Sequence, residues 1–346
     1  MGISHRPRPR PIALDSSALS KLLPELISHR PRSRPIALES STLSKLSPEL
    51  IFCIARFLPP ESATSFSLCC RTIYFTLGTQ YLKALEEDQQ LDRYKFLELL
   101  ERDLPNYISC YYCKKLHGIN EAYRHTIPNR YYVDWSRYLP CWNADFVFLT
   151  NSYINERFSF TVFQMTMKLY RQGLDYSKLL KFLSCKTTTC LRGGYDEQRM
   201  TLARIVDGSL LIREQKIVMI PPAQPIPFST ICRHFSFMWP ERFDLFKNNI
   251  QIAHLVQPED YRNWKGIIQC KYCLTEFRID FKNLGEQGNE MYVTKWQDLG
   301  QGRSPLDHKW QRHIARYKWL PVAFDRGSIC AAFEQKEHFR FEFDGV

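Results

Sequence analysis

The sequence lacks the short motifs by which many enzymes bind phosphate or activate a nucleophile. It contains no Gly-x-x-x-x-Gly-Lys-Ser/Thr phosphate loop, no Gly-x-Ser-x-Gly nucleophile elbow and no His-Glu-x-x-His zinc helix. The pair Gly300 and Gly302 is too short a glycine pattern to cradle a dinucleotide. These absences favour a protein that is not an enzyme.

Long hydrophobic runs are also missing. No segment approaches the roughly 18 apolar residues of a membrane span, and the N-terminus is rich in Arg and Pro where a signal peptide would be continuously apolar. We therefore expect an intracellular protein, in the cytoplasm, the nucleus or both, with no membrane partner. In such a compartment its twelve cysteines should be free or bound to metal, not paired in disulfides.

Hydrophobic residues make up 44% of the chain and aromatic residues 14%, which is ample for a globular core. The formal net charge is +11, but residues 1–35 hold seven Arg or Lys side chains against two acidic ones, which leaves +6 for the rest. Residues 1–42 therefore form a basic arm. Its alternating Arg and Pro residues predict an extended, solvated segment without a folded core.

The arm contains a direct duplication. Residues 4–27 and residues 28–51 differ at four positions. Only the second copy continues into a longer helical pattern, because His29, Arg30 and Pro31 interrupt the first. A solenoid normally needs three or more stacked repeats, so we interpret the pair as a recent duplication or an artefact of the gene model.

Residues 43–77 have the pattern of a small helical hairpin. Ser47 can cap a helix, Pro48 suits the first helical position, and Glu49 favours the positive end of the helix dipole. An apolar stripe at helical spacing follows, and Pro59 with Pro60 ends the first helix. The stripe consists of Leu46, Leu50, Ile54, Phe57 and Leu58. On pattern alone, an ordinary helical pair inside a larger core fits equally well.

The same residues resemble the fungal F-box family. The shared features are a Leu-x-Pro-Glu-Leu start, a following Ile, a Leu-Pro break and a Leu-x-x-Arg segment that ends at Arg71. The resemblance implies that this region docks on the Skp-type adaptor of a cullin-RING ubiquitin ligase. The docking residues it implies are Leu46, Pro48, Glu49, Leu50, Ile54 and Leu58.

A first pair of cysteines follows a helix that we predict over residues 79–101. Cys110 and Cys113 are separated by two residues, a spacing that can place both thiolates on one Zn²⁺, and His117 and Cys141 are the nearest candidates for the other two ligands. The segment around them is similar to one found in many fungal F-box proteins. Buried, reduced cysteines at a helix end are the alternative.

A second pair, Cys270 and Cys273, precedes a predicted strand, which suits half of a zinc-ribbon-like site. Cys232 and His234 are candidates for the other half. The F-box family resemblance supports these four residues as one tetrahedral set. Both pairs could also be interpreted as a dithiol redox centre, but neither pair lies at the strand-to-helix junction that such a centre needs.

The rest of the chain predicts an α+β fold. A helical F-box at 43–80 is followed by a domain of mixed helices and antiparallel strands at 81–346, which structural zinc would stabilise. Asp207-Gly208 between two apolar runs predicts a β-hairpin. We expect helices at 158–171, 175–183 and near 306–317, and strands at 201–206, 210–220, 276–281, 290–297 and 338–343.

The family resemblance implies a substrate-recognition adaptor of an SCF-type cullin-RING ubiquitin ligase, which binds an unknown protein substrate through the domain after the F-box. The alternative is a zinc-containing nucleic-acid-binding or interaction protein without a ligase role. The basic arm and tyrosines such as Tyr111 and Tyr112 favour that alternative, but the basic residues lack the clustering on one face that nucleic-acid binding requires. We therefore do not expect a nucleic-acid partner.

Overall fold

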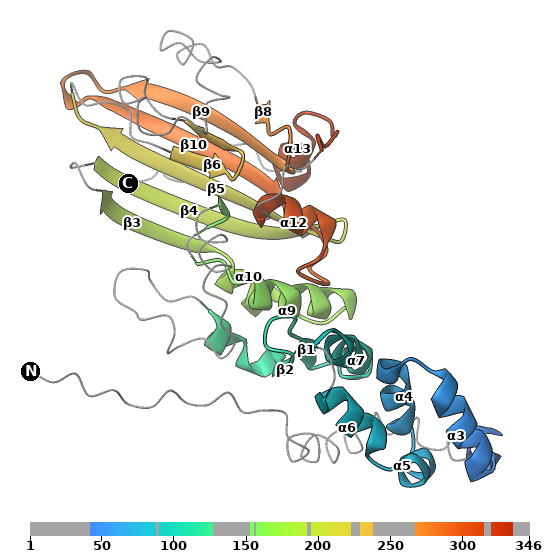
Figure 1. The fold of residues 1–346 in the computed structure, drawn as a ribbon. Coiled ribbons are helices and arrows are strands. Elements are labelled where there is room, and N and C mark those ends of the chain that lie inside the picture. The colour runs from blue at the N-terminus through green and yellow to red at the C-terminus, as the bar shows by residue number, and fades with distance from the viewer. Residues whose placement is uncertain are drawn as a thin grey trace, which may run out of the picture. The chain divides into compact units, whose positions relative to one another are not determined.

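The computed structural model describes residues 42–87, 90–126, 153–155, 157–191, 195–222, 229–237, 267–314 and 320–334. The chain divides into two compact units, Met1–Gly118 and Ile119–Val346 (Figure 1). The first unit is mainly helical and the second is built on a six-stranded sheet, which confirms the mixed α+β class. Among the residues described, no helix is both long and apolar enough to cross a membrane. Residues 1–41, with most of the basic arm and the first repeat copy, lie outside the described residues.

The first unit begins with η1 (Thr42–Lys45) and α3 (Pro48–Phe57). Pro48 occupies the first turn of α3, Glu49 follows it, and Ser47 is the N-cap residue with extended backbone. The backbone N–H groups of Leu50 and Ile51 donate to the Ser47 carbonyl, whereas the Ser47 side chain makes no capping hydrogen bond. The predicted helix start is therefore confirmed, but not the capping role of the hydroxyl.

Two breaks in the chain turn the predicted hairpin into three short helices. Leu58 is extended before Pro59, so α3 ends and α4 (Pro60–Ser67) begins afresh. Cys70 is also extended, with φ −154° and ψ 161°, and separates α4 from α5 (Arg71–Leu77). Ile51 and Ala55 of α3 form one core with Ile73 and Leu77 of α5, and Phe66 of α4 packs against it.

The helix predicted over 79–101 is two helices, α6 (Gln80–Glu87) and α7 (Gln90–Asp103). Leu82 from α6 packs in the same buried cluster as Leu100 from α7. One straight helix would hold those residues about 27 Å apart at 1.5 Å per residue, so the chain must change direction. The apolar contacts of the cluster therefore overrule the unbroken helical pattern. A two-stranded hairpin, β1 (Tyr107–Ser109) with β2 (Leu116–Gly118), completes the unit.

The second unit contains one antiparallel sheet whose strands lie in the order β3-β4-β5-β10-β9-β8. Their bounds are β3 (Cys185–Leu191), β4 (Tyr195–Val206), β5 (Ser209–Ile220), β8 (Ile268–Gln269), β9 (Thr275–Asn283) and β10 (Asn289–Asp298). A separate hairpin pairs β6 (Ser229–Cys232) with β7 (Phe235–Phe237).

The predicted hairpin at Asp207-Gly208 is confirmed. Both residues have positive φ, 48° and 75°, and they join β4 to β5. The strands expected at 276–281 and 290–297 lie within β9 and β10. Strand β3, with its Lys-Thr-Thr-Thr run, has no apolar alternation and was not predicted. The strand expected at 338–343 lies outside the described residues.

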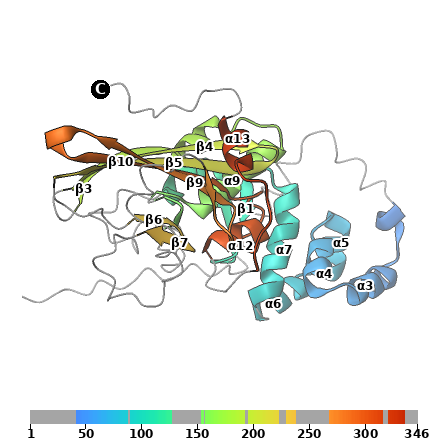
Figure 2. The same ribbon diagram turned by 90° about the horizontal axis from the view of Figure 1, so that it is seen from above.

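Helices and the small hairpin cover both faces of the sheet. On one face α13 (Ser328–Glu334) packs Ile329 and Phe333 against Trp296 of β10. The β6–β7 hairpin packs on the other face, where α12 (His308–Ile314) also lies (Figure 2). The unit further contains η2 (Ile119–His125), α9 (Phe160–Arg171), α10 (Ser177–Phe182) and η6 (Gly285–Gln287). Helices α9, α10 and α12 lie within the three predicted ranges.

The face that carries the β6–β7 hairpin also holds buried charged residues. Lys295 of β10 lies 2.6 Å from a carboxylate oxygen of Glu214 on β5, and Lys216 lies 2.7 Å from Glu197 on β4. Burial works to raise the pKa of Glu214, but the Lys295 ammonium holds it below its ordinary value. These ion pairs explain why β5 is buried along nearly its whole length although charged residues interrupt its apolar pattern.

Candidate docking surface and metal sites

Helix α3 turns one side toward the core and leaves apolar side chains on another. Ile51 and Ala55 are each 1% exposed, whereas Leu50 is 52% exposed and Phe57 is 90% exposed. Leu50, Ile54 and Phe57 follow one another at spacings of four and three residues, so they share a side of the helix. We call these three residues the α3 stripe. A contiguous apolar stripe on a surface helix is typical of a binding site for another protein.

None of the six predicted docking residues is fully buried, although Leu46 packs against the core of the first unit. Pro48, Glu49 and Leu50 are exposed, and Leu46, Ile54 and Leu58 are partly buried. A hydrogen bond from the Ser47 hydroxyl lowers the pKa of Glu49, which favours its negative form at the start of the helix. Phe57 belongs to the apolar pattern of the sequence but is not among the six docking residues that the family resemblance implies. Its exposure adds it to the candidate surface.

The first cysteine pair lies in the β1–β2 hairpin. The ligand atoms of Cys110, Cys113 and His117 all lie within 4.8 Å of one another, and Cys113 Sγ is 3.2 Å from His117 Nε2. Lys114 has φ 52°, and its N–H donates to the Cys110 carbonyl at 3.0 Å, which forms the tight turn between the ligands. Ser109 anchors the hairpin to α7 through two hydrogen bonds to Glu101.

Burial alone would lower the pKa of His117, but hydrogen bonds with Cys110 and Cys113 raise it to about 9. In the absence of metal, the His117 imidazole would therefore be protonated at neutral pH. Cys141, the predicted fourth ligand, lies outside the described residues. Three of the four predicted ligands of this site are thus brought together.

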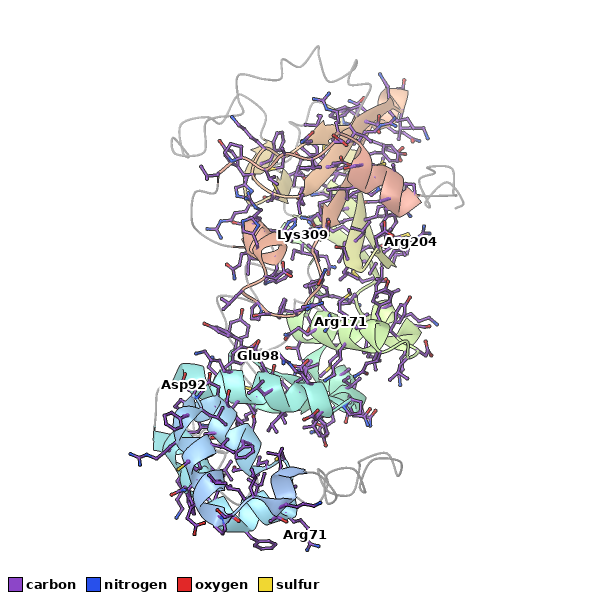
Figure 3. The ribbon with its side chains drawn as sticks, turned by 90° about the vertical axis from the view of Figure 1, so that its right-hand side faces the viewer. Arg71, Asp92, Glu98, Arg171, Arg204 and Lys309 are labelled. Atoms are coloured by element: carbon purple, nitrogen blue, oxygen red, sulfur yellow. The ribbon has the colours of Figure 1, made fainter. Side chains whose placement is uncertain are left out.

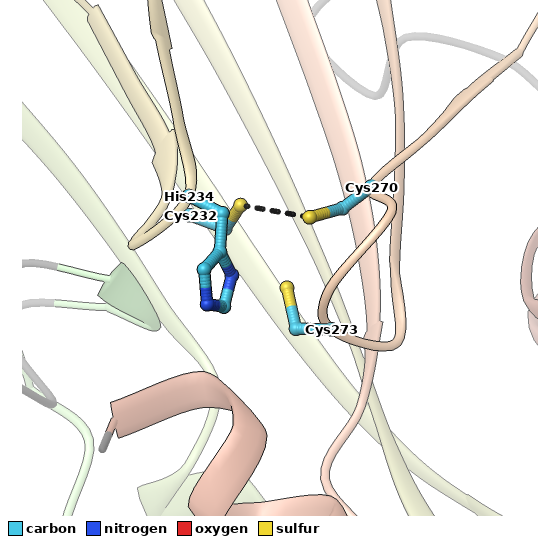
Figure 4. A group of neighbouring side chains, drawn as sticks. All are labelled: Cys232, His234, Cys270 and Cys273. Atoms are coloured by element: carbon cyan, nitrogen blue, oxygen red, sulfur yellow. Dashed lines mark hydrogen bonds between the residues drawn. The ribbon is translucent and has the colours of Figure 1, made fainter. Parts of the chain in front are cut away.

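The second set joins two segments that are far apart in the sequence. Cys232 ends β6, His234 follows in the turn to β7, and Cys270 and Cys273 lie in the turn before β9 (Figure 4). Their ligand atoms also lie within 4.8 Å of one another. Cys232 Sγ and Cys270 Sγ are 3.7 Å apart. Two thiolates on a tetrahedral Zn²⁺, each with a bond of about 2.3 Å, would be about 3.8 Å apart.

The chemistry of this set fits a metal ion. All three cysteines are buried and none forms a disulfide. Both ring nitrogens of His234 are buried and have no hydrogen-bond partner among the described residues, so a metal bond would satisfy one of them. Burial raises the pKa values of Cys232 and Cys273, and hydrogen bonds from these two thiols lower that of Cys270. A divalent metal would replace the shared protons and hold all three sulfur atoms as thiolates.

Polar groups in and next to the Cys270–Cys273 turn lie close to two of the sulfur atoms. The N–H of Tyr272 points at Cys270 Sγ at 3.4 Å, and the hydroxyl of Thr275 lies 3.2 Å from Cys273 Sγ. The Cys270 N–H donates to the Thr275 carbonyl at 2.8 Å and closes the turn. Donors near a sulfur atom stabilise its thiolate form, which is the form that binds metal.

Comparison with known proteins adds one finding to this geometry. Residues 43–85 match the family model of the F-box domain. No curated protein and no solved structure matches the chain significantly. The matched residues run from η1 to α6 and contain the α3 stripe. An F-box domain therefore occupies residues 43–85 of this chain.

Proposed function

We propose that this protein is a substrate-recognition adaptor of an SCF-type cullin-RING ubiquitin ligase. The observation that carries the proposal is the F-box domain at residues 43–85 with apolar side chains exposed on its first helix. The partner of this surface is the Skp-type adaptor, through which the protein joins the cullin. Leu46, Pro48, Glu49, Leu50, Ile54 and Leu58 form the contact, and Phe57 extends it.

The protein contributes proximity to the ubiquitin transfer reaction. The F-box domain holds the chain on the ligase, and the sheet-containing unit holds an unknown protein substrate near the charged ubiquitin enzyme. The transfer chemistry is that of the ligase partners, so this chain is not itself an enzyme. Such a role belongs to the cytoplasm, the nucleus or both, where cullin ligases act.

We further propose that zinc is a structural cofactor of both cysteine sets. In the sheet unit Cys232, His234, Cys270 and Cys273 supply the complete tetrahedral donor set of a structural site. In the helical unit Cys110, Cys113 and His117 supply three donors, and Cys141 remains the candidate for the fourth. When bound, zinc supplies a cross-link between segments and takes no part in a reaction.

Co-purification with a Skp-type adaptor tests the docking role. The full chain is compared with Leu50→Asp combined with Ile54→Asp, which places two charges on the α3 stripe. Leu174→Asp with Leu306→Asp is the matched control, because these leucines are 47% and 58% exposed and belong to the second unit. We expect the control to retain the adaptor and the stripe variant to lose it.

Two results would contradict the proposed adaptor function. Adaptor binding that is equal in the stripe variant and the wild type would remove the F-box docking role. Nucleic-acid binding that disappears when residues 1–35 are deleted would favour a nucleic-acid-binding protein instead.

A further inference from the structure

Helix α12 is hydrogen-bonded to the segments that carry the second set, and contacts with the sheet and with an aromatic core hold it in place. Lys309, labelled in Figure 3, lies 2.6 Å from the Asp298 carboxylate at the end of β10, and His313 Nε2–H donates to the Asp298 carbonyl at 2.9 Å. The Trp310 side chain is 0% exposed, and its ring centroid lies 4.7 Å from that of Phe160 and 5.6 Å from that of Phe158. A helix held at the sheet and in an aromatic core is a rigid support for its neighbours.

Arg312 connects this helix to the Cys270–Cys273 turn. Its side chain is buried, and Nη1 donates to the carbonyl of Tyr272, which lies between the two cysteines, at 3.2 Å. The same nitrogen donates to the Leu320 carbonyl at 2.9 Å. Close by, the Val322 N–H donates to the Lys271 carbonyl at 2.9 Å, so both residues between the ligands are held through their carbonyl groups.

Arg233 connects the other half of the set to the same helix. This residue lies between Cys232 and His234, and its Nη1 donates to the carbonyl of Ile314, the last residue of α12. Both halves of the set are therefore hydrogen-bonded to the same helix. Neither arginine can be a zinc ligand, because a guanidinium stays protonated and has donors only.

We propose that Arg312 and Arg233 are positioning residues that preorganise the Cys232, His234, Cys270 and Cys273 set for zinc. This inference rests on the zinc part of the proposed function. Without the two arginines, the turns that carry the ligands would have to be ordered when the metal binds, and this ordering would reduce affinity. Residues that orient metal ligands from outside the coordination shell typically change metal affinity by about 10- to 100-fold.

The test measures Zn²⁺ affinity of the full chain by competition with a chromophoric chelator. We expect Arg312→Met to weaken zinc binding at this set about 10- to 100-fold. Arg312→Lys keeps the charge and one hydrogen bond and should recover part of the loss. Arg326→Met removes an exposed arginine from the same unit and is the matched control, with unchanged affinity expected. In Arg312→Met, Co²⁺ should also give a weakened tetrahedral thiolate spectrum.

A merely structural arginine would give a different result. Arg312→Met would then lower the Tm equally with and without Zn²⁺, with zinc affinity unchanged, and that result would overturn the inference while leaving the zinc site intact. If Arg312→Met does not fold, Arg233→Met supplies the same comparison from the other half of the set. Wild-type protein that binds no Zn²⁺ would overturn the zinc proposal and this inference together. The adaptor role would not be affected by that result, because it is tested by co-purification with the adaptor.

Discussion

The two Cys-x-x-Cys turns look alike in the sequence but lie in different surroundings. Cys270 and Cys273 are buried, meet Cys232 and His234 from a separate hairpin, and border the six-stranded sheet. Cys110 is buried but Cys113 is only partly so, and the strands of their hairpin are three residues long. The spacing thus predicts the turn, whereas the fold determines how completely a site is built around it.

A metal at each of the two sets would also close a loop of different length. The second set joins β6–β7 to the turn before β9 across about 35 residues of sequence, so a metal there would close a long loop. The described ligands of the first set, Cys110, Cys113 and His117, span eight residues within one hairpin, so a metal held by them would close only a short loop. We therefore expect the sheet unit to depend on metal far more than the helical unit does.

The largest effect should come from Cys270→Ser combined with Cys273→Ser. This variant should lose one equivalent of zinc and destabilise the sheet unit by about 5 kcal/mol or more, because structural zinc binding is itself part of the folding free energy. Metal analysis and thermal unfolding check both effects. Cys330→Ser, in the same unit but outside the cluster, should change neither. Metal-free wild-type protein that is well folded would rule out both zinc sites.

A smaller effect should follow from protonation of His313 on α12, whose side chain is buried and only 1% exposed. Burial lowers its pKa to about 4 from the ordinary 6.5. The unfolded chain therefore takes up a proton first as the pH falls, and stability that is present above pH 6.5 is lost on the way to pH 4. The loss from this residue should be about 3 kcal/mol.

Denaturant unfolding of the wild type and His313→Gln at several pH values measures this effect. Both proteins are kept in the same zinc-containing buffer, so that acid release of the metal affects each equally. The stability advantage of the wild type at pH 7 should shrink toward pH 4. Curves that remain parallel between pH 7 and pH 4 would show that His313 does not titrate in this way.

The smallest effect should come from Cys110→Ser combined with Cys113→Ser. These residues lie in a short hairpin that can relax, so we expect a cost of about 1–3 kcal/mol, confined to the first unit. The zinc content should fall by one equivalent while the unfolding of the sheet unit stays unchanged. Hydrogen exchange, read separately in the two units, checks where the change occurs. Equal destabilisation of both units would contradict the prediction that the first cysteine pair stabilises only the first unit.

The sequence predicted features that depend on local chemistry. The start of α3 at Pro48, the Asp207-Gly208 turn and the convergence of Cys232 with Cys270 follow from residue type and spacing, the last with help from family resemblance. Features that depend on long-range packing were missed. The bend between α6 and α7 arises because Leu82 and Leu100 share a core, which a helical pattern cannot reveal.

Strand β3 shows the same limit at the edge of the sheet. Its Lys-Thr-Thr-Thr run has no apolar alternation, and it becomes a strand only because β4 offers a partner along its whole length. The hydrogen bonds of Arg312 to the Tyr272 and Leu320 carbonyl groups were equally hidden, since an arginine within a helix gives no sign of which carbonyl groups it will reach. Local pattern therefore indicated where ligands lie, and packing determined what supports them.

The central claim is that the F-box domain binds a Skp-type adaptor through α3, independently of the metal sites. The most direct test is the Kd of the purified full chain for that adaptor, measured for the wild type, for Leu50→Asp with Ile54→Asp, and for Cys110→Ser with Cys113→Ser. We predict that the first variant binds at least about 100-fold more weakly, as expected when charges replace anchors at an interface centre, and that the second binds as tightly as the wild type. An unchanged Kd for Leu50→Asp with Ile54→Asp would contradict the account.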